Sequence, residues 1–483
     1  MRLKSIFSNK VILYLWTRYV TYVIQFLSSI FIAVKLGPYY FGIWGMILLI
    51  LNYFQVINFG IPSSINILLV QNKKNTVVTN NYIKSAIVLN ILLNCIVLLI
   101  MGIYYLFFRA TSTVGKYFYF VCIIAMLAYF NGLNTVVYRV KGRLSEVAFY
   151  QSVIPILLLV SMFSITTSGR NLLGVFLLVY FIGHIVSLVV FLQKRQVPLN
   201  GTASKQDCSE ILNKGLFIFI YNACFYLIII STRTIVSVFY PVKQFGFFTF
   251  AYSLAQAVIL FLDTIQFVIL PKVIDKLYSK DIAAVKRTLK KLRTNYIYLA
   301  HGLMYLAMLF FPLLLYFIPK YRETLQLMNM IGVTVLLLTN NFGYSSFLMA
   351  RNKEKMLSLI SFSSLLVTIA GGLLLSMIFR VTYQYIVIST LLGYFYFCFF
   401  CIRQGYKLLE VKVNFINIMA EIFPLKLLLP YVLAFLISIF NFVHLFFIPF
   451  IIFTLLNLNT TKEWLSTLKT IIHEPQFINI NKD

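Results

Sequence analysis

Apolar segments recur along the whole chain, and short polar segments separate them. Most are long enough to cross a bilayer as an α-helix, which takes about 20 residues. The last two are the weakest, because Pro424, Lys426 and Pro430 interrupt them, so twelve spans are the alternative to fourteen. The fourteen predicted spans have the approximate bounds 11–34, 41–70, 83–108, 117–138, 147–167, 171–193, 215–238, 245–271, 295–319, 324–350, 356–379, 383–402, 422–440 and 443–459.

The start of the chain resembles a signal peptide only in its charge. Arg2, Lys4 and Lys10 precede the first apolar segment, but that segment is too long for a cleavable signal and contains Arg18. We interpret it as the first retained span. Both span counts are even, so we expect both ends of the chain on one side of the membrane.

Composition and charge agree with this pattern. Hydrophobic residues make up 61% of the chain and charged residues 11%, whereas a soluble protein has about 25% charged residues. Of the 41 lysines and arginines, 31 fall on the side of the termini, 8 on the opposite side and 2 inside spans. This positive-inside asymmetry predicts an all-α polytopic protein with both termini cytoplasmic. It also explains the net charge of +28 without a nucleic-acid partner.

The two halves of the sequence contain matching motifs at the same spacing. Asn9-Lys10 precedes the first span and Phe41-Gly42 opens the second, while Asn213-Lys214 and Phe245-Gly246 do the same 204 residues later. Six spans separate equivalent points, so the halves share one orientation, as parallel repeats do. We therefore predict an N-terminal six-helix lobe, a cytoplasmic linker, a C-terminal six-helix lobe, a cytoplasmic loop, an extra helix pair and a cytoplasmic tail. Their bounds are 1–193, 194–214, 215–402, 403–421, 422–459 and 460–483.

The segment 272–293 is strongly basic and has apolar residues at helical spacing. Val285 and Leu289 belong to the apolar set, and Arg293 is among the basic residues that fall elsewhere around the helix. This pattern is typical of an amphipathic helix lying on an anionic inner leaflet. A solvated connector between spans is the alternative.

Residues for catalysis or for a resident metal are scarce. Eleven of the thirteen acidic residues fall in predicted cytoplasmic segments, leaving Asp263 inside a span and Glu323 outside. The longest outer loop, 109–116, contains no acid, and the four histidines are dispersed. We therefore expect no catalytic site, no metal and no cofactor. Coupling of transport to H⁺ or Na⁺ is left open.

Two arginines, Arg18 and Arg233, lie inside predicted spans. A charged side chain near the bilayer centre costs at least ~2.5–3.5 kcal/mol, so such residues usually face a wet cavity or a partner. Because the guanidinium group binds two phosphate oxygens and keeps its proton, a phosphate is the ligand that it suits best. The alternatives are an ion pair with Asp263 or extension of Arg18 to the inner interface. Further polar residues at membrane depth, as charge partners or cavity groups, are Gln25, Asn58, Asn222, Gln256, Gln266, Asn340 and Asn341.

The stretches 35–44, Lys-Leu-Gly-Pro-Tyr-Tyr-Phe-Gly-Ile-Trp, and 56–64, Val-Ile-Asn-Phe-Gly-Ile-Pro-Ser-Ser, carry a resemblance to a known family. They are similar to the N-terminal signature of the polysaccharide transporters, the O-antigen and capsule repeat-unit flippases of the multidrug/oligosaccharidyl-lipid/polysaccharide exporter superfamily. The resemblance implies a MATE-like fold with two six-helix lobes around a cationic cavity, and a diphosphate site at Arg18. Many relatives have an acid at the position of Asn58, so an ion-coupling role of that acid does not transfer.

From the residues and the resemblance we predict a flippase rather than an enzyme. Its cargo would be undecaprenyl-diphosphate-linked oligosaccharide, moved from the cytoplasmic to the outer leaflet of a bacterial inner membrane by alternating access, with Arg18 and Arg233 holding the diphosphate. Membrane lipids, a polysaccharide polymerase and a chain-length regulator are the expected partners. The alternatives are a peptidoglycan-precursor flippase, a cation-coupled multidrug exporter of the same fold, and a membrane glycosyltransferase or polymerase.

Overall fold

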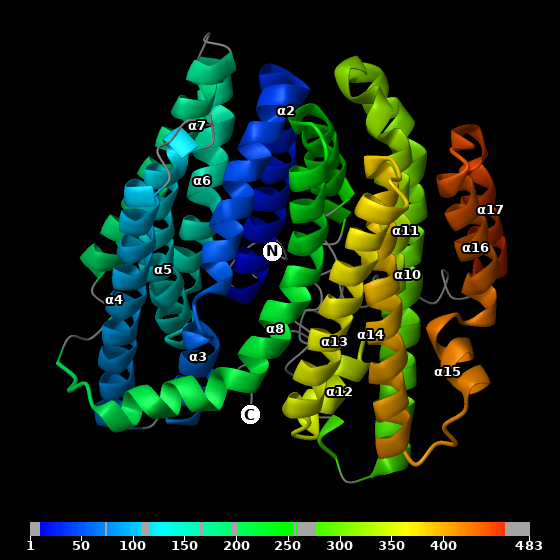
Figure 1. Cartoon of the computed structure of the whole chain (residues 1–483). Helices are drawn as coiled ribbons and strands as arrows, with labels where there is room; N and C mark the ends of the chain where they lie inside the picture. Colours follow the sequence, from blue (N-terminus) through cyan, green and yellow to red (C-terminus); the bar gives the residue numbers. More distant parts are fainter. Residues whose placement is uncertain are drawn as a thin grey trace, which may run out of the picture.

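The fold is built from helices that run roughly side by side (Figure 1). The computed structural model describes residues 10–72, 75–107, 115–164, 169–194, 197, 200–255, 257–258, 277–279 and 281–458. Within these residues every regular element is a helix, and ten helices are long and apolar enough to cross a membrane. The predicted all-α polytopic class is confirmed.

The α-helices are α2 (Lys10–Val56), α3 (Ile61–Gln71), α4 (Thr76–Phe107), α5 (Phe118–Val140), α6 (Leu144–Ser164), α7 (Gly169–Lys194), α8 (Lys205–Phe239), α10 (Ile282–Phe317), α11 (Leu325–Thr339), α12 (Tyr344–Ala350), α13 (Glu354–Leu373), α14 (Val387–Leu408), α15 (Phe415–Ile422), α16 (Leu425–Ile439) and α17 (Phe447–Leu456). Residues 242–255 are also helical. Short 3₁₀ turns η1 (Gly115–Tyr117), η2 (Pro319–Thr324), η4 (Tyr383–Ile386) and η5 (Val443–Leu445) and the π-turn η3 (Leu374–Ile378) lie at helix ends.

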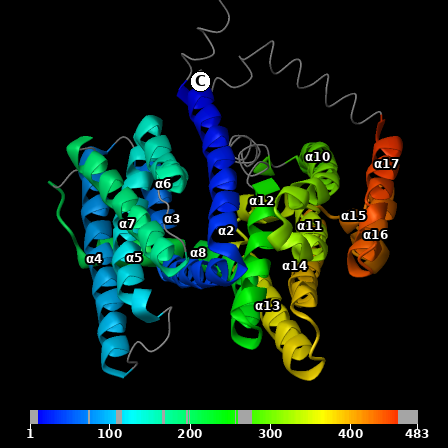
Figure 2. The ribbon, with the colours of Figure 1, turned by 90° about the horizontal axis from the view of Figure 1, so that it is seen from above.

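Two groups of helices stand side by side. Seen from above, α3 to α7 lie on one side, α10 to α14 on the other, and α2 runs between them (Figure 2). The helix α2 packs mainly against α6, and the later turns of α8 pack mainly against α13, so we count α2 with the first group and those turns of α8 with the second. The helices α15 to α17 lie at the far edge of the second group. We call the end of the bundle across which the first turns of α8 run the lower end, and the opposite end the upper end, as drawn in Figure 1.

The helix α2 contains two of the predicted spans. Gly37 interrupts it with φ 68° and ψ 169°, and Pro38 follows. A positive φ is readily adopted by glycine, so the chain reverses there without steric strain. The second span continues past a turn at 57–60 into α3, and Gly60 in that turn also has a positive φ of 73°. The predicted span 41–70 is therefore broken near its middle.

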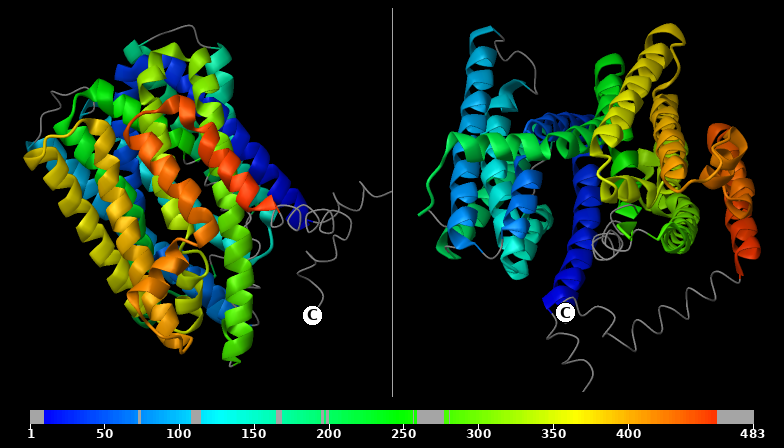
Figure 3. Two further views of the ribbon diagram at one scale, coloured as in Figure 1. Left: turned by 90° about the vertical axis from the view of Figure 1, so that its right-hand side faces the viewer. Right: turned by 90° about the horizontal axis from the view of Figure 1, so that it is seen from below.

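The helix α8 connects the two groups. Its first turns run across the lower end of the molecule, as the view from below shows (Figure 3). There the Lys214 ammonium donates to Gln71 Oε1 at 2.6 Å. A Cβ atom on Gly215 would lie 1.8 Å from Ser64 Oγ, so the backbones of α8 and α3 are in close contact. The later turns of α8 pack along α13, so one helix carries residues to both groups.

The helix α10 corrects the prediction of a helix on the membrane surface. It runs without a break from Ile282 for 36 residues, or about 54 Å, which is longer than a bilayer crossing. Its basic first turns are thus the lower end of a spanning helix. Arg293, which the pattern assigned to the solvated side, is only 4% exposed.

The C-terminal helices are shorter than predicted. The axes of α15 and α16 are bent by 71° at a break, and only together do they reach the length of a span. The helix α17 has 10 residues, or about 15 Å, against a hydrocarbon core of about 30 Å. The predicted spans 422–440 and 443–459 thus each correspond to a helix that is too short to cross the membrane by itself.

Candidate functional site

Arg18 lies in the first half of α2 and is half-buried against α6. Its Nε donates to the Tyr22 hydroxyl at 2.7 Å, and its Nη1 donates to Gln151 Oε1 at 3.1 Å. The guanidinium carbon also lies 5.3 Å from the centre of the Tyr22 ring. The Tyr22 hydroxyl and the Gln151 amide thus orient the guanidinium between α2 and α6.

The same face of α2 carries Gln25. It lies two helical turns after Arg18 and is exposed. On an adjacent face, the Thr21 and Ser152 hydroxyls are 2.5 Å apart and join α2 to α6. The first half of α2 thus has one side attached to α6 and a polar strip beside it.

Arg233 lies near the upper end of α8 and is 6% exposed. Its Nη2 donates to the Gly45 carbonyl at 3.5 Å, which is a long bond between the two helix groups. The guanidinium carbon lies 5.3 Å from the centre of the Tyr252 ring and 5.9 Å from that of Phe245, in range of cation–π attraction. Its Nε has no partner among the described residues. Aromatic rings and one carbonyl therefore surround a buried cation.

Asp263, Gln256 and Gln266 lie outside the described residues. An ion pair between Asp263 and either arginine thus stays a prediction. Across the described part of the chain, no group of three or more His, Cys, Asp or Glu side chains could hold a metal ion.

A cavity of about 500 Å³ lies between the lower halves of the helices, and we call it the polar cavity. Its walls come from the end of α2, the turn before α3, and from α3, α4, α5, α6 and α8. The wall that α8 supplies belongs to turns that also contact α14, through Tyr221 and Phe225, whereas none of the described lining residues comes from α10 to α14. Its size is typical of small-molecule sites, which have about 300–1,000 Å³.

Two of the predicted polar residues, Asn58 and Asn222, line the polar cavity. Asn58 is used by the local backbone, because its Nδ2 donates to the Gln55 carbonyl at 2.7 Å and its Oδ1 accepts from the Gly60 amide at 2.9 Å. Asn222 is exposed and makes no side-chain hydrogen bond with described residues. Neither Arg18 nor Arg233 is among the described lining residues, and no described contact joins the two arginines.

The helix groups meet closely at the upper end. A Cβ atom on Gly42 of α2 would lie 2.2 Å from the Val242 carbonyl oxygen, and one on Gly246 would lie 1.9 Å from the Pro38 carbonyl oxygen. Gly42 and Gly246 are the equivalent residues of the two halves in the sequence. Below them the Tyr53 and Thr234 hydroxyls are 2.6 Å apart, which joins α2 to α8. The upper end is therefore closed, while the polar cavity occupies the lower half.

Sequence comparison identifies the family. The model of a family described as "Polysaccharide biosynthesis protein" matches residues 7–277, which is more than half of the chain. The chain belongs to this family. No curated protein matches the sequence.

Solved structures of MATE proteins share the fold of this family member. One is an inward-facing MATE transporter of the MOP superfamily, with a TM-score of 0.64, 11% identity, and coverage of 86% of this chain and 99% of that one. A MATE protein in the straight conformation gives a TM-score of 0.60 at 12% identity, covering 85% and 96%. An outward-facing MATE transporter gives 0.58 at 11% identity, covering 86% and 97%. The MATE-like fold is therefore confirmed.

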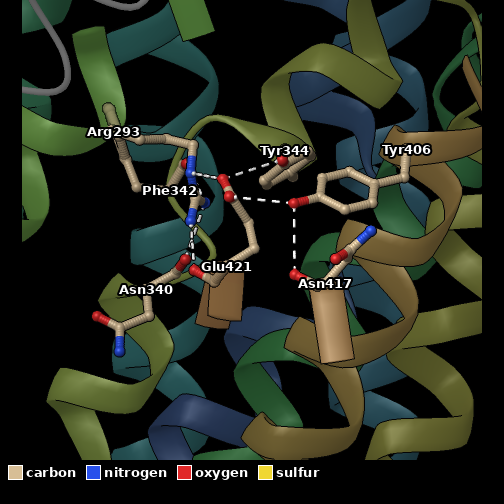
Figure 4. Close-up of polar contacts among 7 residues, drawn as sticks. All are labelled: Arg293, Asn340, Phe342, Tyr344, Tyr406, Asn417 and Glu421. Carbon is tan, nitrogen blue, oxygen red and sulfur yellow. Dashed lines mark hydrogen bonds and ion pairs between the residues drawn. The ribbon is translucent and has the colours of Figure 1, made fainter. Parts of the chain in front are cut away.

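One polar cluster of this family member was missed by the sequence pattern (Figure 4). Arg293 Nε lies 2.8 Å from Glu421 Oε1, and the Arg293 guanidinium also donates to the carbonyls of Asn340, Phe342 and Glu421 at 2.9, 3.1 and 2.9 Å. The Glu421 carboxylate accepts from the hydroxyls of Tyr344 and Tyr406, each at 3.1 Å. This cluster joins α15 to α10, to α14 and to the turn before α12.

A signal for Arg293 was present in the sequence. It is four residues after Leu289 and four before Ile297, both buried, so it continues the apolar stripe of α10. An arginine on such a stripe indicates a buried partner. Glu421 could not be identified as that partner, because 128 residues separate the two.

Proposed function

We propose that this protein is a flippase for an oligosaccharide linked to undecaprenyl diphosphate. The membrane-spanning fold and the membership in a polysaccharide biosynthesis family support lipid-linked sugar as the cargo class. The observation that carries the proposal is the pairing of a closed upper end with a polar cavity in the lower half. That pairing is the arrangement expected of a transporter open toward one side.

Alternating access accounts for both features. In α2, Gln55 of the cavity wall follows Gly42 by 13 residues, so the cavity begins about 20 Å below the upper contact. The cargo enters from the lower end, and the helix groups then rock apart at Gly42 and Gly246 to release it above. The lower end carries the excess of basic residues, so we take it as the cytoplasmic side of a bacterial inner membrane, with both termini there.

The two arginines are proposed to act in sequence on the diphosphate. Arg18 is half-buried and donates to the Gln151 amide oxygen, and an oxygen of the diphosphate takes the place of that amide. Arg233 is about 10 Å further up α8 than Tyr226 of the cavity wall, and it becomes accessible when the upper end opens. The prenyl chain stays in lipid between the groups. An inside-negative potential favours outward movement by ~2.3 kcal/mol per charge per 100 mV.

The test is a flipping assay in proteoliposomes. Purified protein is reconstituted with undecaprenyl diphosphate that carries a trisaccharide with a reducible fluorophore, and dithionite is added outside. The wild type should expose the probe from the inner leaflet. Arg18→Ala should slow exposure about 10- to 100-fold, because hydrogen bonds to a charged group contribute about 1.5–3 kcal/mol. Flipping by Arg18→Ala at the wild-type rate overturns the assignment.

Three controls make the assay specific. Arg170→Ala removes an exposed arginine at the start of α7 and should leave the rate unchanged. A labelled glycolipid without phosphate should not be flipped, whereas a general lipid scramblase moves it as well. The same assay with the peptidoglycan precursor as the probe distinguishes the alternative cargo, because a precursor flippase moves it faster than the trisaccharide lipid.

A further inference from the structure

We infer that the polar cavity binds uncharged sugar residues of the cargo, at a place distinct from the arginines assigned to the diphosphate. This inference rests on the proposed function and adds the chemical class of sugar. The cavity combines amide groups, phenol groups and aromatic faces from seven segments of the chain. No charged side chain is among its described lining residues.

Two amides are available for ligands. Gln55 from α2 and Asn222 from α8 line the cavity, are exposed, and make no side-chain hydrogen bond with described residues. A primary amide donates and accepts, and so does a sugar hydroxyl or an N-acetyl group. The two amides come from two different helices, so one sugar bound to both bridges α2 and α8.

The walls also carry a third amide acceptor and flat apolar surfaces. Asn90 donates through Nδ2 to the Tyr129 carbonyl at 3.0 Å, while its Oδ1 has no donor among the described residues, so it can accept from a hydroxyl. The rings of Tyr150 and Tyr226 line the cavity from α6 and α8. A phenol ring offers an apolar face and a polar edge, which suits the alternating C–H and O–H surfaces of a pyranose ring. One turn beyond Asn90, Asn94 is buried, and neither of its amide atoms has a hydrogen-bond partner among the described residues.

The charge of the lining selects the sugar. An anionic sugar in this cavity would lose hydration without gaining a cationic partner among the described lining residues, and burying an unpaired charge is costly. A hydroxyl or N-acetyl group can instead form hydrogen bonds with the amide groups of the lining. The diphosphate has its partner nearby, because Arg18 binds Gln151, the residue that follows Tyr150 of the cavity wall. The anionic and neutral parts of one cargo molecule are therefore recognised on two sides of α6.

The test measures the two recognitions separately on full-length protein in lipid nanodiscs. Saturation-transfer difference NMR follows binding of N,N′-diacetylchitobiose, of a uronic-acid disaccharide of the same length, and of inorganic pyrophosphate by competition with a ³¹P reporter. We expect the neutral disaccharide to bind at least tenfold more tightly than the acidic one. Gln55→Leu and Asn222→Leu should each weaken it at least fivefold and leave pyrophosphate binding unchanged. Arg18→Gln should weaken pyrophosphate binding and leave binding of the neutral disaccharide unchanged.

Asn213→Leu is the matched control, because it makes the same exchange on the same helix outside the cavity lining. It should leave all three affinities unchanged. Equal binding of neutral and acidic disaccharides, no disaccharide binding by the wild type, or wild-type affinity in both leucine variants overturns the inference. If the wild type binds the neutral disaccharide but not pyrophosphate, the diphosphate assignment is wrong and the assignment of the polar cavity to sugar stands. The two failures are therefore distinguishable.

Discussion

Gly42 and Gly246 pack against each other where the two helix groups meet. A Cβ atom on Gly42 would lie 3.1 Å from the Gly246 nitrogen, and one on Gly246 would lie 3.0 Å from the Gly42 nitrogen. The two residues hold equivalent positions 204 residues apart in the sequence. A contact between equivalent residues is expected where two related halves face each other across a symmetry axis. This contact therefore lies where the two related halves meet.

The first prediction concerns Gly42→Ala. The added methyl group would meet the Val242 carbonyl oxygen at 2.2 Å, so it should destabilise the closed upper end. Overpacking of this kind costs about 1–3 kcal/mol, which corresponds to a shift of about 5- to 150-fold toward the upper-open state. Spin labels at the exposed positions Tyr39 and Lys243, on either side of the contact, should report a longer distance by pulsed electron resonance.

Gly102→Ala is the control for this prediction. A Cβ atom on Gly102, in α4, meets nothing within 4 Å, so the substitution should leave the distance distribution as in the wild type. Gly246→Ala should reproduce the effect of Gly42→Ala from the other side. An unchanged distance in both gate variants would contradict the role of this contact in closure.

The second prediction concerns the Tyr53 hydroxyl. The Thr234 hydroxyl donates to the Ile230 carbonyl at 2.9 Å, so Tyr53 is the donor in their 2.6 Å bond between the groups. Tyr53→Phe should weaken closure by about 0.5–1.5 kcal/mol, a shift of about two- to twelvefold in the same labelled pair. Tyr117→Phe removes a hydroxyl that donates to the Arg170 carbonyl within the first group, and it should leave the distance distribution unchanged. Equal shifts in both variants would rule out a specific role of the Tyr53 hydroxyl in closure of the upper end.

The third prediction concerns the Arg293–Glu421 pair. Arg293→Met leaves the Glu421 carboxylate, whose side chain is 31% exposed, without its cation. Removing one partner of a buried pair costs about 3–5 kcal/mol, and solvent at Glu421 lowers this to about 2–4 kcal/mol. Thermal unfolding in detergent should show a clearly lower midpoint for Arg293→Met and partial recovery in the double variant with Glu421→Leu. Arg351→Met should leave the midpoint nearly unchanged, and the absence of recovery would contradict a pairwise interaction.

The sequence predicted those parts of the fold that depend on local signals. Gly37 and Pro38 separate two apolar runs, so two spans could be expected, and the structure has two helical segments that meet at Gly37. The turn at 57–60 was missed, because the apolar run continues through it, although Asn58 and Gly60 are turn-forming residues. The shortness of α17 was missed for a similar reason, since hydropathy does not show where a helix ends.

The candidate site depends on contacts between distant parts of the chain. The sequence identified Arg233 as unusual but could not show that 188 residues separate it from its partner Gly45. Asn222 was expected at a cavity, and it does line one, yet its neighbour Gln55 was not singled out. Apolar periodicity reports which face of a helix is buried. It does not report which helix lies opposite, so the composition of the polar cavity required the structure.

The last prediction separates a ligand role from a packing role for Arg233. Its Nε is buried without a described partner, and its contacts are aromatic rings and one long hydrogen bond. A buried cation without an anion among the described residues has a large desolvation cost, and an apolar residue of similar length removes that cost. Arg233→Met should therefore keep or raise the thermal midpoint, whereas the same exchange at Arg293 lowers it. In the flipping assay Arg233→Met should nevertheless be about 10- to 100-fold slower, because the diphosphate loses its second cation. Arg233→Lys, which retains the charge, should recover part of the rate. A stable variant that flips at the wild-type rate would remove Arg233 from the transport path, and a variant that loses both stability and rate would assign it to closure of the upper end.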